Sequence, residues 1–152
     1  MQYDIERAVV CVVGLGYVGL PLALAFARSL KVIGFDIDSN KIKELDRNNQ
    51  SQNVHFTGDP RYIKQADFVI IAVPTPLTKS KTPDLSHVMH SSTLVAENLR
   101  KGAVVVLEST VYPGVTEEVV KPILEGSGLE CGCDFKIAYS PERINPGDEE
   151  HT

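Results

Sequence analysis

The 152-residue sequence predicts a single α/β domain built on a doubly wound parallel sheet of about six strands, with helices on both faces. Two observations lead to this prediction. Short runs rich in Val and Ile alternate along the chain with segments that have helical periodicity. The runs are also almost continuously apolar, so the strands they form have no polar side to present to water, as in a parallel sheet that is covered on both faces.

The first quarter of the chain predicts the order strand, helix, strand, helix. Residues 7–13 form a buried strand, and residues 17–30 form a helix with apolar residues at helical spacing. Pro21 falls in the first turn of this helix, where a missing amide hydrogen costs little. A second short strand begins at residue 31 and ends at Asp36, and the charged segment 39–49 forms the next helix.

The rest of the chain continues the alternation and completes six strands. The proline-punctuated segment 74–83 is expected to be a loop. The other predicted elements are a weak strand at 54–57, a short helix at 59–66, a strand at 67–73, a helix from the N-cap Asp84 to Arg100, a strand at 103–110, a helix at 113–125 and a last strand at 135–140. Right-handed crossovers between such strands give a doubly wound sheet.

The end of the first strand carries three spaced glycines in the segment GLGYVG. Gly14, Gly16 and Gly19 match the pattern G-x-G-x-x-G between a strand and a helix. In this pattern the first glycine allows a tight turn, the second lets the backbone approach a pyrophosphate, and the third lets the helix pack on the strand. Tyr17 and Val18 complete the turn, whose amide hydrogens attract phosphate charge. The segment predicts a dinucleotide-binding Rossmann fold.

The acidic residue expected in such a fold is Asp36, which ends the second strand 22 residues after Gly14. Its carboxylate can accept hydrogen bonds from both ribose hydroxyls, and it would repel an added 2′-phosphate. The predicted cofactor is therefore NAD rather than NADP. Lys41, one turn into the next helix, has two equally supported roles: a contact with the adenosine side of NAD, or a place on a solvated helix face.

Composition excludes several classes of function. The chain has 15 basic and 20 acidic side chains, a net charge of −5 and no Lys/Arg-dense stretch, which argues against a nucleic-acid or anionic-membrane surface. The first apolar run is shorter than the ~20 residues of a membrane span, and no leader precedes it. Three cysteines, an odd number, predict reduced thiols and a cytoplasmic protein.

No metal site is expected. Cys131 and Cys133 are one residue apart, without the second pair or the histidine that a zinc site requires. His87 and His90 are three residues apart on a predicted helix and have no third ligand in view. We expect both histidines to be at the surface or partly packed.

Four motifs occur in one order: GLGYVGLPLA at 14–23, VPTP at 73–76, ESTVYPGVTEE at 108–118 and YSPERINPGD at 139–148. Together they resemble the UDP-glucose/GDP-mannose dehydrogenase family over essentially the whole chain. The form PERINPG is similar to the branch that acts on UDP-N-acetylhexosamines. The resemblance implies an NAD-dependent oxidation of the sugar C6 alcohol to a carboxylate, in two hydride transfers through an aldehyde and a thioester, as used in polysaccharide biosynthesis.

The resemblance also implies roles for residues near the cofactor. Pro74 and Thr75 follow a buried strand, and Thr75 is expected against the ribose or adenine of NAD. Thr110 is expected to contact NAD near the nicotinamide and to orient the hydrolytic water. The alternative role for both threonines is the capping of turns.

The motif at the end of the chain implies the substrate side of the site. Glu142 matches a glutamate that assists proton transfer and thioester hydrolysis, and Arg143 and Ile144 are expected to line the UDP-sugar site. The alternative for Glu142 is an exposed loop carboxylate. Where the UDP-glucose branch has a second acid, residues 145–147 read Asn-Pro-Gly, which argues against UDP-glucose as the substrate.

One part of the family pattern is missing from these 152 residues. The cysteine nucleophile of the family lies in a GGxCxxKD segment, preceded by a lysine, and neither occurs here. Cys131 and Cys133 lack that context, so we do not assign them the role. We expect residues 1–152 to be the amino-terminal, NAD-binding part of a longer dehydrogenase, inactive by itself, whose parent is a homodimer or larger.

Three other interpretations stay open at the level of sequence. UDP-glucose 6-dehydrogenase is the nearest, and another NAD-linked dehydrogenase, such as a 3-hydroxyacid type, uses the same sheet but does not predict SPERINPG after the sixth strand. The chain could also be a stand-alone NAD-binding sensor or interaction module. The epimer of the N-acetylhexosamine is not set by these residues.

Overall fold

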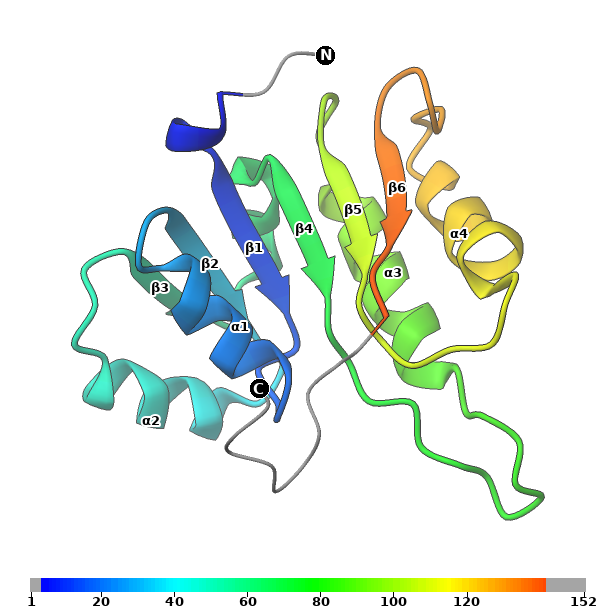
Figure 1. Cartoon of the computed structure of the whole chain (residues 1–152), viewed down its shortest axis with the longest axis horizontal. Coiled ribbons are helices and arrows are strands. Elements are labelled where there is room, and N and C mark those ends of the chain that lie inside the picture. Colours follow the sequence, from blue (N-terminus) through cyan, green and yellow to red (C-terminus); the bar gives the residue numbers. More distant parts are fainter. Residues whose placement is uncertain (1–3, 142–152) are drawn as a thin grey trace.

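The computed structural model describes residues 4–141, which form one six-stranded sheet with helices on either side (Figure 1). The strands lie in the order β3-β2-β1-β4-β5-β6, and every neighbouring pair is parallel. The direction of the strand order reverses between β1 and β4. In a doubly wound sheet this switch point, at the carboxyl ends of the strands, is where ligands bind.

All six predicted strands are present, and the predicted helical segments are helical or contain helix. The strands are β1 Val9–Val13, β2 Lys31–Phe35, β3 Val54–Thr57, β4 Phe68–Ile71, β5 Val104–Leu107 and β6 Lys136–Tyr139. The α-helices are α1 Gly19–Phe26, α2 Ser39–Asn48, α3 Ser86–Asn98 and α4 Lys121–Glu125. Shorter helical turns are η1 Ile5–Arg7, η2 Pro60–Gln65 and the π-helical turn η3 Thr116–Val120.

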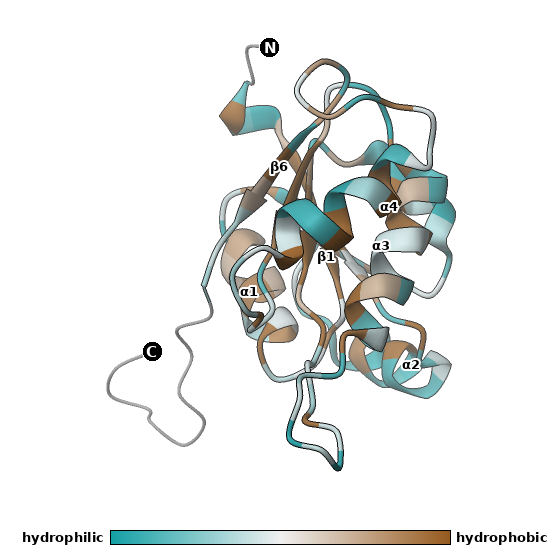
Figure 2. Cartoon of the chain, turned by 90° about the vertical axis from the view of Figure 1, so that its right-hand side faces the viewer, coloured by the Kyte–Doolittle hydropathy of each residue, from teal (hydrophilic) through white to brown (hydrophobic). Residues whose placement is uncertain are grey.

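The sheet separates two hydrophobic cores. Alternate residues of β1 show this, because Cys11 and Val13 belong to one core while Val10 and Val12 belong to the other. The helices α1 and α2 cover the second core, and η2, α3, η3 and α4 cover the first. In Figure 2 the strands in the middle of the molecule are mostly brown, whereas teal residues lie on the outer sides of helices. Burial on both faces explains the continuous apolar runs.

The covering of the sheet is less complete at β5 and β6 than the sequence predicts. In β5, Val104 and Val106 stay partly exposed while Val105 and Leu107 are buried. β6 has no fully buried residue, and Tyr139 is 44% exposed. Among the described residues, the helices therefore cover one face of the last two strands and leave the other partly exposed.

Two helices are shorter in the structure than the sequence predicts. The segment 17–30 is α-helical only over α1, because the chain tightens after Phe26 into turns that lead to β2; Leu30 is apolar, but it packs on the core from a turn. The long helix begins at Ser86 rather than after an N-cap at residue 84. Asp84 lies two residues before the helix begins and still accepts a hydrogen bond from the Ser86 amide at 2.9 Å.

The segment 113–125 is helical, but its first part has the wider π-helical turn. Pro122 lacks an amide hydrogen, and in a continuous α-helix its ring would clash with the carbonyl group of residue 118. The wide turn η3 ends at Val120, and α4 starts afresh at Lys121 with Pro122 in its first turn. The structure thus places proline where a helix tolerates it.

Candidate dinucleotide site

The turn between β1 and α1 requires glycine at two of its three glycine positions. Gly14 has φ +94°, and a Cβ atom there would lie 2.7 Å from the Ala72 carbonyl oxygen. At Gly19 a Cβ atom would lie 1.8 Å from the carbonyl oxygen of Gly14. The chain therefore crosses close to itself, and the first turn of α1 packs directly on the end of β1.

Gly16 differs, because a Cβ atom there would meet no protein atom within 4 Å. The fold itself does not need glycine at this position, so the free space is available to a ligand. Within the part of the chain that the structure describes, the amides of Gly16 and Val18 donate to no protein acceptor. The amide of Leu15, in contrast, donates to the Asp36 carboxylate at 2.9 Å. Two amides at the start of a helix that have no acceptor among these residues can bind an anion.

Asp36 is buried, with 7% of its surface exposed, and it accepts three hydrogen bonds. Its Oδ2 atom accepts from the Leu15 amide and from Lys41 Nζ at 2.8 Å, and its Oδ1 atom accepts from the Asp38 amide at 2.9 Å. Burial by itself would raise the pKa of Asp36. The hydrogen bonds from Lys41, Asp38 and Leu15 outweigh burial and lower the pKa below its ordinary value, so the carboxylate stays ionised.

Lys41 reaches the site because α2 begins immediately after Asp36. Asp38 is the N-cap of α2, and its side chain accepts hydrogen bonds from the amides of Asn40 and Lys41. This cap fixes the first turn of the helix, from which the lysine side chain extends back to Asp36. Lys41 therefore lines the candidate site next to Asp36, and its contact with NAD stays a prediction.

A cavity of about 270 Å³ opens at the carboxyl ends of β1, β2 and β4. Its lining includes Gly14, Gly16, Asp36, Lys41 and Pro74 from the predicted site. The opposite wall is one face of α3, formed by His87, His90, Ser91 and Leu94.

The two histidines are exposed, as expected, but they line this cavity, which the sequence did not indicate. Their spacing in the sequence placed them on one helix face. It gave no sign of what that face would meet.

A second cleft of about 320 Å³ adjoins the first. It is lined by Tyr17, Val18, Thr75 and Thr110 from the predicted site, and also by Glu108 and Ser109. The two hollows share Gly16, Ala72, Val73 and Pro74, so they lie next to each other along the carboxyl edge of the sheet, and together we call them the channel. Every described residue of the predicted cofactor site lines it except Gly19, which packs α1 on the sheet.

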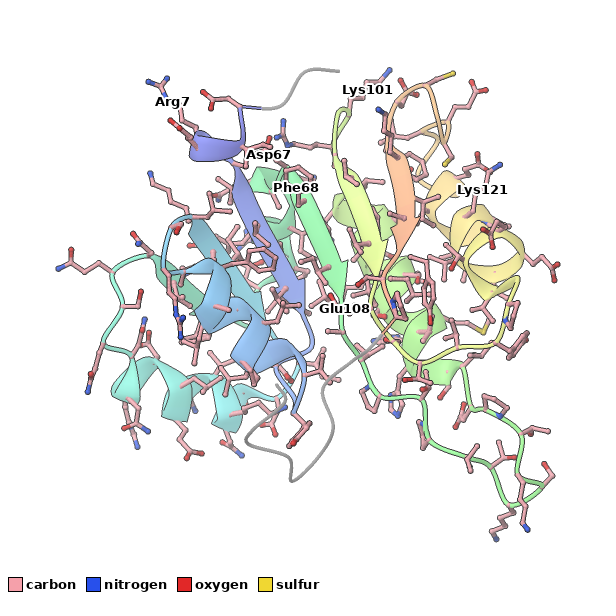
Figure 3. The ribbon with its side chains drawn as sticks, in the orientation of Figure 1. Arg7, Asp67, Phe68, Lys101, Glu108 and Lys121 are labelled. Atoms are coloured by element: carbon pink, nitrogen blue, oxygen red, sulfur yellow. The ribbon has the colours of Figure 1, made fainter. Side chains whose placement is uncertain are left out.

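Sequence reasoning missed Glu108 and Ser109. In Figure 3, Glu108 lies at the carboxyl end of β5, at the opposite end of the strands from Asp67 and Lys101. The signal was present in the sequence, because both residues directly precede Thr110 at the end of a predicted strand. The predicted residues Glu142, Arg143 and Ile144 lie outside the described residues.

The cysteines take no part in the site. Cys11 is fully buried in β1, and burial raises the pKa of its thiol to about 12. Cys131 and Cys133 precede β6, at its amino end, whereas the channel lies at the carboxyl ends of the strands. The nearby Glu130 carboxylate raises the pKa of Cys133, which disfavours the thiolate that a nucleophile needs.

Comparison with known proteins identifies the family. Residues 8–51 and 45–151 match the NAD binding domain of the UDP-glucose/GDP-mannose dehydrogenase family. The chain belongs to this family. NAD is accordingly the cofactor of the domain, in agreement with the prediction from Asp36.

Individual relatives are similar over nearly the whole chain. The protein CapL of Staphylococcus aureus is 51% identical over 94% of this chain, and the UDP-N-acetyl-D-glucosamine 6-dehydrogenase of Salmonella typhi is 43% identical over 99%. The structure of UDP-D-ManNAc dehydrogenase from Pyrococcus horikoshii is 36% identical, with a TM-score of 0.84 over 91% of this chain. The chain spans 37%, 38% and 37% of the lengths of these three proteins, respectively.

Two further classes of feature are absent from residues 4–141 of this family member. No group of three or more His, Cys, Asp or Glu side chains is placed so that it could hold a metal ion. In the same residues, no helix has the length and apolar character that a membrane crossing requires.

The close approach at Gly19 predicts a large loss of stability on Gly19→Ala. The added methyl group must displace the Gly14 carbonyl, so we expect the free energy of unfolding to fall by about 3 kcal/mol. Gly16→Ala is the matched control and should change it by less than about 0.5 kcal/mol. Urea denaturation followed by circular dichroism measures both. Equal stability of the two variants would contradict the packing role of Gly19.

The lowered pKa of Asp36 predicts a pH-dependent contribution to stability. Because the folded-state pKa lies below the unfolded value of about 3.9, the contribution is complete above that pH and is lost as pH falls through the folded-state pKa. We expect Asp36→Asn to lower the free energy of unfolding by about 2 kcal/mol at pH 7.

The difference between Asp36→Asn and wild type should shrink as the solution is acidified below about pH 4. Urea denaturation at several pH values measures it. Asp46→Asn, on the exposed surface of α2, is the control and should show no such dependence. A difference for Asp36→Asn that is constant down to acidic pH would contradict the assignment of the ionised form.

Proposed function

We propose that this domain binds NAD in an extended form along the channel, as the amino-terminal part of an NAD-dependent UDP-N-acetylhexosamine 6-dehydrogenase. The parent enzyme would oxidise the C6 alcohol of the sugar to a carboxylate in two hydride transfers. The observation that carries the proposal is the pair of adjoining hollows that meet at Gly16, where the amides of Gly16 and Val18 donate to no acceptor among the described residues and could bind a diphosphate.

The diphosphate position determines where the two halves of NAD lie. From Gly16, the hollow that contains Asp36 and Lys41 would take the adenosine half, since a carboxylate there can bind ribose hydroxyls. The purine would then continue toward α3, between Ile37 and the face that carries His87 and His90. The second hollow, with Thr75 and Thr110, would take the nicotinamide half.

The hydrogen bonds of Asp36 limit how it can bind ribose. A carboxylate has about four lone-pair sites, and three are occupied by Leu15, Asp38 and Lys41. One ribose hydroxyl can bond to the remaining site on Oδ1. The second ribose hydroxyl can donate to Asp36 only if Lys41 moves away. If Lys41 stays, this hydroxyl can instead accept a hydrogen bond from Lys41. We propose that Lys41 and Asp36 bind the ribose together.

The hydride transfers require that the C6 carbon faces the nicotinamide while a base takes the hydroxyl proton. We propose Glu142 for proton transfer and hydrolysis, Thr110 for orientation of the water, and Arg143 and Ile144 for the UDP-sugar contact. The first transfer moves a hydride from C6 to NAD and gives an aldehyde. The second oxidation requires a cysteine that forms a thioester, and the 152 residues contain no GGxCxxKD segment to supply it.

The substrate class is supported by the relatives and by one departure from the UDP-glucose pattern. Proteins similar to this chain are named UDP-N-acetyl-D-glucosamine 6-dehydrogenase and UDP-N-acetyl-D-mannosamine dehydrogenase. Residues 145–147 carry no acid, which disfavours the UDP-glucose alternative. We also propose that the parent enzyme acts in the cytoplasm, as a homodimer or a larger homo-oligomer.

The channel predicts two properties of cofactor binding. Asp36 should give a preference for NADH over NADPH, and binding of NADH should require the open space at Gly16. Isothermal titration calorimetry should give a Kd for NADPH at least about tenfold higher than for NADH, because the 2′-phosphate approaches the Asp36 carboxylate. Gly16→Val should raise the Kd for NADH by at least about tenfold and leave the unfolding free energy nearly unchanged. Unchanged NADH binding by Gly16→Val would place the diphosphate elsewhere.

The missing nucleophile predicts that residues 1–152 bind NAD without completing the oxidation. Incubation with NAD and UDP-N-acetylglucosamine or UDP-N-acetylmannosamine should yield no uronic acid by mass spectrometry, because no thioester can form. A longer relative such as the Salmonella enzyme serves as the positive control. Formation of a UDP-N-acetylhexosaminuronate by the 152 residues alone would refute this expectation.

A further inference from the structure

Two side-chain hydroxyls tie the ends of β4 and β5 together beyond the paired residues of the sheet. The regular pairing ends at Ile71 and Leu107. The Ser109 hydroxyl then donates to the Val73 carbonyl at 2.7 Å and accepts from the Val73 amide at 3.1 Å. The Thr75 hydroxyl donates to the Thr110 carbonyl at 2.7 Å. We call these three hydrogen bonds the hydroxyl clasp.

The clasp forms where the two strands would otherwise separate. The preceding residue of this segment, Ala72, still donates its amide to Val13 of β1, so Val73 is the point at which the chain leaves the sheet. The Ser109 side chain is buried, with 3% exposure, and it satisfies both main-chain groups of Val73. A serine hydroxyl has one hydrogen to donate and lone pairs to accept with, so this arrangement uses both capacities at once.

Ser109 and Thr75, whose hydroxyls form the clasp, line only one half of the channel, whereas Val73, which Ser109 holds, lines both halves. Ser109, Thr110 and Thr75 line the second cleft, and none of them lines the cavity that contains Asp36 and Lys41. Loosening the clasp would therefore let the loops after β4 and β5 move apart next to the proposed nicotinamide half. The adenosine cavity is held instead by the Asp36 hydrogen bonds.

We infer that Ser109 is a positioning residue for the nicotinamide half of NAD. Ser109 acts through Val73, whose position sets that of Pro74 and Thr75. The loops after β4 and β5 therefore keep the separation at which Thr75 and Thr110 can both face the cofactor. The inference rests on the proposed function, and it adds a residue that acts through the main chain of Val73. A loop held in advance loses less freedom when the ligand binds.

The test compares NADH with ADP, which carries adenosine and diphosphate but no nicotinamide riboside. Calorimetric titration of Ser109→Ala should give a Kd for NADH about tenfold above wild type and a Kd for ADP within about twofold. Ser109→Thr keeps the hydroxyl and should restore most of the NADH affinity. A change that merely weakened the fold would affect both ligands alike.

Ser92→Ala is the matched control. Ser92 is also fully buried, but its hydroxyl has no hydrogen-bond partner among the described residues. Its removal should leave both dissociation constants unchanged. If Ser109→Ala does not fold, Ser109→Cys, whose thiol is a weaker donor and acceptor, should give the same selective loss.

The outcomes separate this inference from the proposed function. Equal losses for NADH and ADP, or no loss for either, would overturn the positioning role of Ser109 while leaving NAD binding intact. Failure of the wild-type protein to bind either ligand would instead refute the proposed function, and the inference would fall with it.

Discussion

The hydrogen bond from the Leu15 amide to the Asp36 carboxylate is the contact on which the geometry of the site depends. It joins the glycine turn after β1 to the end of β2, and the same carboxylate also orders the start of α2 through the Asp38 amide and Lys41. Because burial alone would disfavour the charged form, these donors are what keep Asp36 ionised. The carboxylate that we propose to bind ribose and the turn that we propose to bind the diphosphate are thereby held at a fixed separation.

The two sides of the switch point are built by different means. On the side of β1 and β2, absent side chains matter, since Gly14 and Gly19 allow the chain to cross itself and Gly16 leaves space for a ligand. On the side of β4 and β5, side-chain hydroxyls continue the hydrogen bonding after strand pairing ends. The channel therefore lies between the glycine turn after β1, which has no room for a side chain at Gly14 or Gly19, and the loops after β4 and β5, which are held by side-chain hydroxyls.

Much of this fold could be predicted from the sequence because parallel strands buried on both faces need continuous apolar runs, which are easily recognised. Helix ends were harder to predict. Leu30 carries the apolar pattern beyond the end of α1, because a turn can bury leucine as well as a helix does. Pro122 lies inside the predicted helix at 113–125, and its position coincides with the change from a π-helical turn to α4.

The places of the glycines and Asp36 in the candidate site were predictable because their spacing along the chain reflects a local requirement of the backbone and of the expected ligand. The contacts of His87, His90 and Ser109 were not predictable, because they depend on how α3 and the end of β5 lie against distant segments. A histidine pair on a helix or a serine before a threonine has no distinctive pattern. Only the packed structure shows that these side chains border the channel.

The account depends most on the diphosphate lying against the turn at Gly16. A crystal structure of the protein with NAD tests this directly. We predict that a diphosphate oxygen accepts hydrogen bonds from the Gly16 or Val18 amide while a ribose hydroxyl bonds to Asp36. Diphosphate density at any other place on the protein, with the turn at Gly16 empty, would contradict the account.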